Sequence, residues 1–183
     1  MKKRSSKEIF ADTLLSLAKR EPVERITVKQ IVEASGLSLQ TFYNHFHDKS
    51  ELVIWVHRQM GNRILARIEK GPYSFHELTM DIIRFYEETP GCKSSNFRIG
   101  LEGRCAELSA DIVYKLFATF IRRSSGTEEL TEELDFYLRM YVHAGLYVFS
   151  EWSRKAQAIP AERLAKYLEQ GMPEKLKPYL LEA

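Results

Sequence analysis

The sequence predicts an all-α protein with a small N-terminal head and a larger C-terminal body. Apolar residues recur every three or four positions along most of the chain, which is the period of an amphipathic helix. No segment shows the two-residue alternation that is typical of a strand. Three of the apolar segments follow motifs of the form S/T/D-x-x-E/Q, and such capping boxes begin helices.

The length of 183 residues allows one domain of ordinary size or two small ones, and the composition, 44% hydrophobic and 28% charged, is that of a globular protein. No apolar run approaches the roughly 18 residues that span a bilayer. Glu8 and Asp12 interrupt the segment after the basic start, which is unlike a secretory signal. We therefore expect a cytoplasmic protein. The net charge of +2 gives no general indication of nucleic-acid binding, so any such indication has to be local.

Capping residues and one glycine delimit the helices of the head. The boxes pair Ser5 with Glu8, Thr27 with Gln30, and Asp48 with Glu51. Gly36 is placed to end the second helix in the left-handed conformation, and Ser38 to cap the third. The predicted helices span residues 6–20, 28–35, 38–46 and 48–70. The second and third helices, joined by a tight turn, make a helix-turn-helix, whose second helix enters the major groove of DNA.

The third helix has an outer face of unusual chemistry. At 100° per residue, Phe42 and Phe46 point into the head. The opposite face carries Gln40, Tyr43, Asn44 and His47, with Leu39 at its edge and Thr41 and His45 on a flank. Solvated faces usually collect lysine and glutamate, whereas amides, phenols and imidazoles suit base edges and phosphates. The face therefore predicts DNA recognition.

Each polar group can be given a provisional role. Gln40 and Asn44 can pair bidentately with adenine, and Leu39 can contact a thymine methyl group. Phosphate contacts are expected from Thr41, Tyr43 and His45. Lys49, in the first turn of the fourth helix, and Thr27, at the start of the second, are placed to meet phosphates together with the positive ends of the helix dipoles. Lys2, Lys3, Arg4 and Lys7 form a basic arm that favours non-specific attraction.

Other readings of these residues are less well supported. The head can also be a purely structural element. His45 and His47 lie on different helix faces because of their i, i+2 spacing, so no metal site is predicted. Cys92 and Cys105 match no metal or redox spacing, which indicates buried free thiols. Catalytic motifs are missing from the sequence, so we expect no enzyme and no cofactor.

The segment ITVKQIVEASGLSLQTFYNHFHDKSEL resembles the signature of the TetR/AcrR transcriptional regulators. The matching residues are Thr27, Ala34, Gly36, Leu37, Ser38, Thr41, Phe42, Tyr43, His45, Phe46, Lys49 and Leu52. The resemblance covers residues 5–55 and implies a homodimer on a palindromic DNA operator. It implies DNA contacts from Thr27, Leu39, Gln40, Thr41, Tyr43, Asn44, His45 and Lys49. The MPEKLKPYL tail and the long aromatic helix are also similar to a subgroup linked to dihydroxyacetone kinase operons, in which a kinase-like protein takes part in sensing.

The expected domains are residues 1–50, the helix-turn-helix head, and residues 51–183, a helical regulatory and dimerisation domain, connected by the helix at 48–70. Further helices are expected at 75–88, 97–108, 109–123, 128–156 and 161–171, with a short tail. Residues 136–149 are apolar almost all round, so one side of this helix needs a partner outside its own domain. The predicted dimer contacts are Ala144, Gly145, Tyr147, Val148, Leu164, Tyr167 and Leu168.

The resemblance also implies a small effector inside the body. The candidate lining residues are Phe85, Phe97, Leu101, Arg104, Cys105, Phe117, Phe136, Tyr137, Met140, Tyr141 and His143. Aromatic residues at helical spacing belong more often to a core than to a pocket, and both readings stay open here. Arg104 and Arg139 stand in apolar helices, and a buried arginine needs a carboxylate from the protein or an anionic ligand.

The sequence thus favours a ligand-responsive DNA-binding regulator, with repression favoured over activation. One alternative is a regulator controlled by a partner protein. A second is a helical interaction module without sequence-specific DNA binding.

Overall fold

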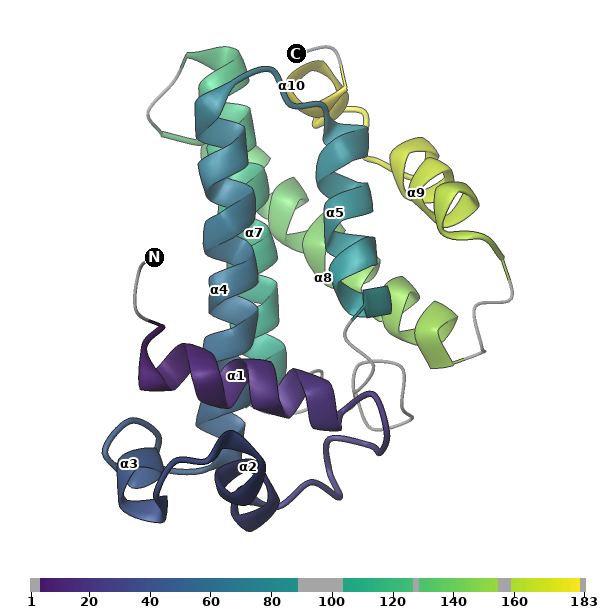
Figure 1. Cartoon of the computed structure of the whole chain (residues 1–183). Coiled ribbons are helices and arrows are strands. Elements are labelled where there is room, and N and C mark those ends of the chain that lie inside the picture. Colours follow the sequence, from purple (N-terminus) through teal and green to yellow (C-terminus); the bar gives the residue numbers. More distant parts are fainter. Residues whose placement is uncertain (1–3, 89–103, 127–128, 155–158, 182–183) are drawn as a thin grey trace.

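The computed structural model describes residues 4–88, 104–126, 129–154 and 159–181, and this part of the chain is helical and has no strand (Figure 1). The prediction of an all-α fold is confirmed. The helices are α1 (Ser6–Leu17), α2 (Val28–Ser35), α3 (Leu39–Tyr43), α4 (Lys49–Lys70), α5 (Phe75–Glu88), α7 (Arg104–Ser125), α8 (Glu132–Arg154), α9 (Ala161–Gln170) and α10 (Lys177–Leu180).

The predicted caps of the head are present. The Ser5 hydroxyl accepts from the Glu8 backbone N–H at 3.3 Å, and the Glu8 carboxylate accepts from the Ser5 N–H at 2.7 Å. Thr27 and Gln30 form the same reciprocal pair at 3.2 and 2.7 Å. Gly36 ends α2 with a φ of 69°, a conformation that glycine adopts without steric cost. These local contacts fix where α1 and α2 begin and where the turn to α3 lies.

Two boundaries in the head differ from the prediction. α1 ends at Leu17 rather than at residue 20, and α3 ends at Tyr43 rather than near Phe46. The Asp48 carboxylate caps α4 by accepting from the Glu51 N–H at 2.8 Å. Glu51, however, accepts from the N–H of His47 at 2.6 Å instead of completing the box.

The predicted break between helices at 108 and 109 is wrong, because α7 runs without interruption from Arg104 to Ser125. Ser109, where the second of these helices was expected to begin, lies inside α7 and is only 3% exposed. Its hydroxyl oxygen is 3.5 Å from Nδ1 of His57 on α4. Burial lowers the pKa of His57 to about 4, so the ring is neutral at pH 7. Residues 97–103 of the expected preceding helix lie outside the described residues.

A capping box of the form S-x-x-E also begins α5. Ser74 and Glu77 form a reciprocal capping box, in which Glu77 accepts from the Ser74 N–H at 2.8 Å and donates its own N–H to the Ser74 hydroxyl at 3.1 Å. The helix then begins at Phe75, as predicted.

The core of the head is built around three phenylalanine rings. Phe10 of α1 packs edge-on against Phe42 at 5.2 Å between ring centroids and against Phe46 at 6.5 Å. All three are at most 2% exposed. Leu52 and Val56, from the first turns of α4, complete this core and join the helix-turn-helix to α4.

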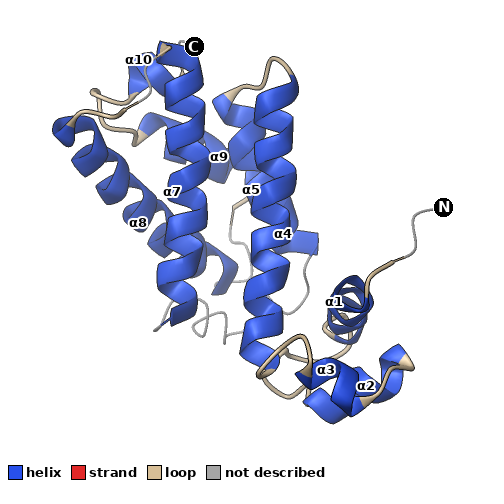
Figure 2. Ribbon diagram, turned by 90° about the vertical axis from the view of Figure 1, so that its left-hand side faces the viewer, coloured by secondary structure: helices blue, strands red, loops and turns tan. Residues whose placement is uncertain are grey.

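Beyond Val56, the same helix packs into the core of the body. Met60, Ile64 and Ile68 of α4 are buried among residues of α5, α7 and α8. Helices α4 and α7 lie side by side in both views (Figures 1 and 2). Gly61 permits this close approach, because a Cβ atom at Gly61 would lie only 2.7 Å from Cγ2 of Ile112.

Candidate nucleic-acid interface and body cavity

The outer face of α3 is exposed in the way the helical period predicts. Leu39 and Tyr43 are 50% and 53% exposed, although leucine and tyrosine are often buried. Gln40 and Asn44 are exposed beside them, whereas Phe42 of the same helix is fully buried. The Phe42 ring meets the Tyr43 ring edge-on at 5.5 Å, which steadies the exposed phenol. The face thus offers polar and apolar groups on a firmly packed helix.

The two amides on this face are linked. Nε2 of Gln40 donates to Oδ1 of Asn44 at 3.0 Å. The Oε1 atom of Gln40 and the Nδ2 amide of Asn44 keep an acceptor and a donor for another molecule. Adenine presents the complementary pair, an N6 donor and an N7 acceptor, in the major groove. The hydrogen bond therefore holds together two groups that suit one base edge.

The remaining predicted contacts lie at the edges of this face. Ser38 caps α3 by accepting from the Thr41 N–H at 3.0 Å, and the two hydroxyls lie 2.8 Å apart. Thr27 is exposed, and its hydroxyl donates to Gln30 at 2.8 Å. His45 is half-buried, with its ring 6.4 Å from that of Phe46.

Lys49 has a different partner from the one the sequence suggested. Its Nζ atom donates to the backbone carbonyls of Val23, Glu24 and Ile26 at 2.7, 2.9 and 2.7 Å. An ammonium group has three protons, so these three carbonyls use all of them. Desolvation by burial lowers the pKa of Lys49. The side chain fastens the start of α4 to the loop before α2, and the expected phosphate contact has no free donor.

The basic arm is also partly engaged within the chain. Arg4 forms an ion pair with Asp12 at 3.1 Å, and the ammonium of Lys7 lies 5.6 Å from the centre of the Phe46 ring. Lys2 and Lys3 lie outside the described residues.

The body contains an apolar cavity between α5, α7, α8 and α9, with a volume of about 50 Å³. It is lined by Phe75, Thr79, Ile82, Ile83, Val113, Phe117, Tyr141, Val142, Gly145, Leu146, Phe149 and Leu168. Two of the predicted pocket residues, Phe117 and Tyr141, are among them. The sequence contained a signal for the four from α5: Phe75, Thr79, Ile82 and Ile83 follow the helical period, and Thr79 interrupts that apolar stripe with a hydroxyl.

Several other predicted pocket residues lie elsewhere. Phe136 and Met140 are 63% and 46% exposed, and His143 is exposed, because this side of α8 faces away from the body core. Phe85 packs edge-on against the buried ring of His57 at 5.8 Å, and Tyr137 packs against the main core. Phe97 and Leu101 lie outside the described residues, as do the side chains of Arg104 and Cys105.

Arg139 is neither buried nor placed for an anionic ligand. Its Nε donates to the Asp135 carboxylate one turn earlier at 2.7 Å, and its guanidinium lies 4.4 Å from the centre of the Tyr114 ring. The carboxylate raises the pKa of Arg139. Since half of the side chain is exposed, this is a surface ion pair.

The comparisons with known proteins agree with the geometry of the head. Residues 12–55 match the family described as "Bacterial regulatory proteins, tetR family". The head belongs to the TetR family. Members of this family are DNA-binding transcriptional regulators and not enzymes, which confirms the predicted class. No curated protein matches the chain by sequence.

Solved structures of TetR-type proteins resemble this chain over nearly its whole length. The dihydroxyacetone kinase operon activator DhaS is 16% identical, with a TM-score of 0.69 over 95% of this chain and 97% of that one. The TetR family repressor AlkX from Dietzia sp. strain DQ12-45-1b, implicated in biodegradation of n-alkanes, is also 16% identical, with a TM-score of 0.57 over 96% and 95%. At this identity, the likeness establishes a shared fold.

The residues predicted for the TetR-type dimer divide into two groups. Tyr147, Val148 and Tyr167 are 67%, 45% and 54% exposed, and Ala144 is exposed as well. Leu164, at 1% exposure, belongs to the core of its own body, so its prediction as a dimer contact is wrong. Gly145 and Leu168 line the cavity. An apolar stripe in the sequence does not by itself show whether a residue packs in its own core or in a dimer interface.

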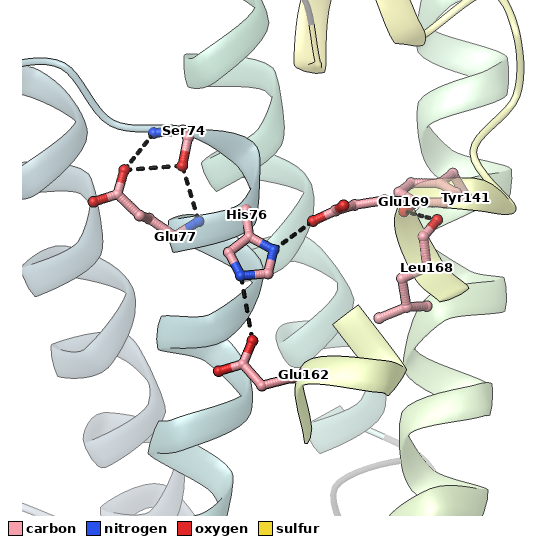
Figure 3. A network of polar contacts seen from close by, with 7 residues as sticks. All are labelled: Ser74, His76, Glu77, Tyr141, Glu162, Leu168 and Glu169. Carbon is pink, nitrogen blue, oxygen red and sulfur yellow. Dashed lines mark hydrogen bonds and ion pairs between the residues drawn. The ribbon is translucent and has the colours of Figure 1, made fainter. Parts of the chain in front are cut away.

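α9 is attached to α5 by a charged contact (Figure 3). Nδ1 of His76 lies 2.7 Å from Oε1 of Glu169, and Nε2 lies 3.4 Å from Oε2 of Glu162. The hydrogen bond to Glu169 is the main cause that raises the pKa of His76. On the same helix, Glu77 has a lowered pKa, chiefly because of its hydrogen bonds with Ser74. Beside this contact, the Tyr141 hydroxyl donates to the Leu168 carbonyl at 2.8 Å.

We expect Lys49→Met to lower the free energy of unfolding by about 1–3 kcal/mol, because three carbonyls lose their donor. Urea unfolding followed by circular dichroism measures the change. Lys29→Met is the matched control, since the Lys29 side chain is 83% exposed. A midpoint equal to that of the wild type would return Lys49 to the list of DNA contacts.

We expect His76→Gln to destabilise the protein more at pH 6 than at pH 9. The folded-state pKa of His76 is raised, so the contact contributes fully below the unfolded value of about 6.5 and is lost as pH rises through the folded value. Urea midpoints at the two pH values test this, with the exposed His47→Gln as control. An equal loss at both values would contradict the charged contact.

Proposed function

We propose that this TetR-family protein is a cytoplasmic homodimer whose two α3 helices read a palindromic DNA operator. The observation that carries the proposal is the outer face of α3, where Leu39, Gln40, Tyr43 and Asn44 stand exposed on a helix whose inner side is buried. A solvated helix face usually collects lysine and glutamate, whereas this face presents two linked amides beside a phenol and a leucine.

The contacts can be divided into those that specify and those that position. Gln40 and Asn44 read a base edge together, and Leu39 meets a thymine methyl group. Thr27, Tyr43 and His45 contact phosphates, and Ser38 and Thr41 hold the start of α3 against the backbone. Lys49 is left out, because its protons serve the head itself.

Dimerisation through α8 and α9 supplies the second recognition helix. Phe136, Met140 and Tyr147 lie on one exposed stripe of α8, at intervals of four and seven residues, and the exposed Tyr167 of α9 belongs to the same proposed surface. A two-fold axis through this stripe would make a four-helix interface and bring the heads into successive major grooves, about 34–36 Å apart.

We assign the DNA-binding role to residues 1–50 and effector binding and dimerisation to residues 51–183. An effector in the body cavity that prefers one spacing of the two heads shifts operator affinity by its differential affinity for the two states. α4 carries the change, because its two ends belong to the two cores.

Repression is the mode we propose, with release of the operator by the effector. DhaS is an activator by name and AlkX a repressor, so this fold serves both modes. A promoter–reporter assay with and without the gene separates them. Control by a partner protein is the alternative to a free effector.

The first test is fluorescence anisotropy against DNA that flanks the gene, beside a scrambled duplex at the same salt concentration. Tight, salt-dependent binding with preference for the native duplex supports the proposal. Equal weak binding to both duplexes, together with no preferred sequence in a selection from random DNA, would contradict the proposal. It would favour a helical interaction module without sequence-specific DNA binding.

Gln40→Ala should weaken binding to the preferred operator by about 1–3 kcal/mol and relax preference at one base pair. Tyr43→Phe is the comparison, since loss of a phosphate contact should weaken binding to all sequences alike. Selection from a randomised operator library gives both profiles. An unchanged profile for Gln40→Ala would remove its base-reading role.

Tyr147→Glu should split the dimer, because an unpaired carboxylate buried in an interface costs about 3–5 kcal/mol, or at least about 100-fold in dissociation constant. Light scattering across a concentration series reports the mass. Lys115→Glu, at an exposed position of α7, is the charge-change control. Should Tyr147→Glu stay dimeric, the interface lies on another surface.

A further inference from the structure

The chemistry of the body cavity limits what it can hold. Ten of its twelve lining residues have no polar side-chain atom, and none of the described lining residues carries a charge. Moving an ion into such surroundings without a partner is costly. The cavity therefore selects uncharged molecules that are mostly hydrocarbon.

One polar atom in this lining has no partner. Thr79 is 5% exposed, and its Oγ1 atom is a buried side-chain oxygen without a hydrogen bond to any described part of the chain. A buried polar atom left unpaired costs free energy, which a bound group can recover. A hydroxyl both donates and accepts, so it can form a hydrogen bond with either a hydroxyl oxygen or a carbonyl oxygen of a ligand.

Water suits this place poorly. A buried water usually makes two to four hydrogen bonds. Tyr141 is the other lining residue with a polar side-chain atom, and its hydroxyl already donates to the Leu168 carbonyl (Figure 3). A molecule with one oxygen and a hydrocarbon part uses the Thr79 hydroxyl and the apolar walls together.

The dimensions point in the same direction. The cavity volume of about 50 Å³ is smaller than the ~150 Å³ that holds benzene in an engineered cavity. A short hydrocarbon segment of a ligand therefore suits this volume.

We propose that this cavity binds a small uncharged molecule, mostly hydrocarbon, whose single oxygen forms a hydrogen bond with Thr79, such as an aliphatic alcohol, aldehyde or ketone. The inference rests on the proposal that the body holds an effector, and it names the effector's chemical class.

The test compares three probes with one hydrocarbon chain: 1-hexanol, hexanoate and hexylamine at pH 7, where the last two are charged. Titration calorimetry on the full chain measures binding. Trp152 gives a second signal, because its buried ring lies 5.4 Å from that of Phe149, which lines the cavity. Thr79→Val removes the unpaired hydroxyl and keeps the shape, and Thr119→Val on α7, outside the lining, is the control.

We expect 1-hexanol to bind, and the two charged probes to bind at least tenfold more weakly. Thr79→Val should weaken 1-hexanol binding by about 2- to 10-fold without lowering the melting temperature, because the lost hydroxyl had no partner. Thr119→Val should leave 1-hexanol binding unchanged. Equal binding of the charged probes, no effect of Thr79→Val, or no binding of 1-hexanol would each overturn the inference.

Operator binding, measured on the same preparation, separates this inference from the proposed function. If the protein binds its operator but does not bind 1-hexanol, the proposed ligand class is wrong and the proposed regulatory function stands. If the protein binds 1-hexanol but prefers no DNA sequence, the ligand assignment of the cavity stands and the proposed regulatory function is wrong.

Discussion

The structure depends on one packing constraint, namely that α4 belongs to two hydrophobic cores at once. Leu52 and Val56 close the core of the head, and Met60 and Ile64, one and two turns later, are buried in the body. Neither core is complete without this helix, so the head cannot change its orientation without a response from the body. Coupling between the body and the head would need only a two-state element that both sides bias, and α4 belongs to both cores.

The start of α4 shows how stability and recognition compete for the same residue. A lysine in the first turn of a helix is disfavoured by the dipole, and a phosphate would compensate for it. Three carbonyls of the preceding loop compensate instead, at 2.7 to 2.9 Å. The head thus satisfies the cation internally, and the amides, the phenol and the imidazoles remain as the groups proposed for DNA recognition. Binding strength is then less dependent on this charge than the sequence suggests.

Local rules predicted the parts of the molecule that local contacts determine. The Ser5 and Thr27 boxes, the left-handed Gly36 and the inward phenylalanines follow from neighbours within a few residues. The errors arise where tertiary contacts decide: Ser109 has the residue type of a cap but is buried against α4, and Leu164 has the pattern of an interface but fills its own core. The contact between Lys49 and a loop more than twenty residues earlier has no sequence pattern at all.

Gly61 gives the connecting helix a mechanical property. With Cγ2 of Ile112 only 2.7 Å from where a Cβ atom would be, the Ile112 side chain of α7 packs directly on the α4 backbone at Gly61. This point acts as a fulcrum. From there to Lys49, the helix extends about 18 Å at 1.5 Å per residue, so it forms a lever arm with the head at its end. A small tilt at the fulcrum becomes a larger displacement of α3, and the stiffness of the lever sets how little the body has to move.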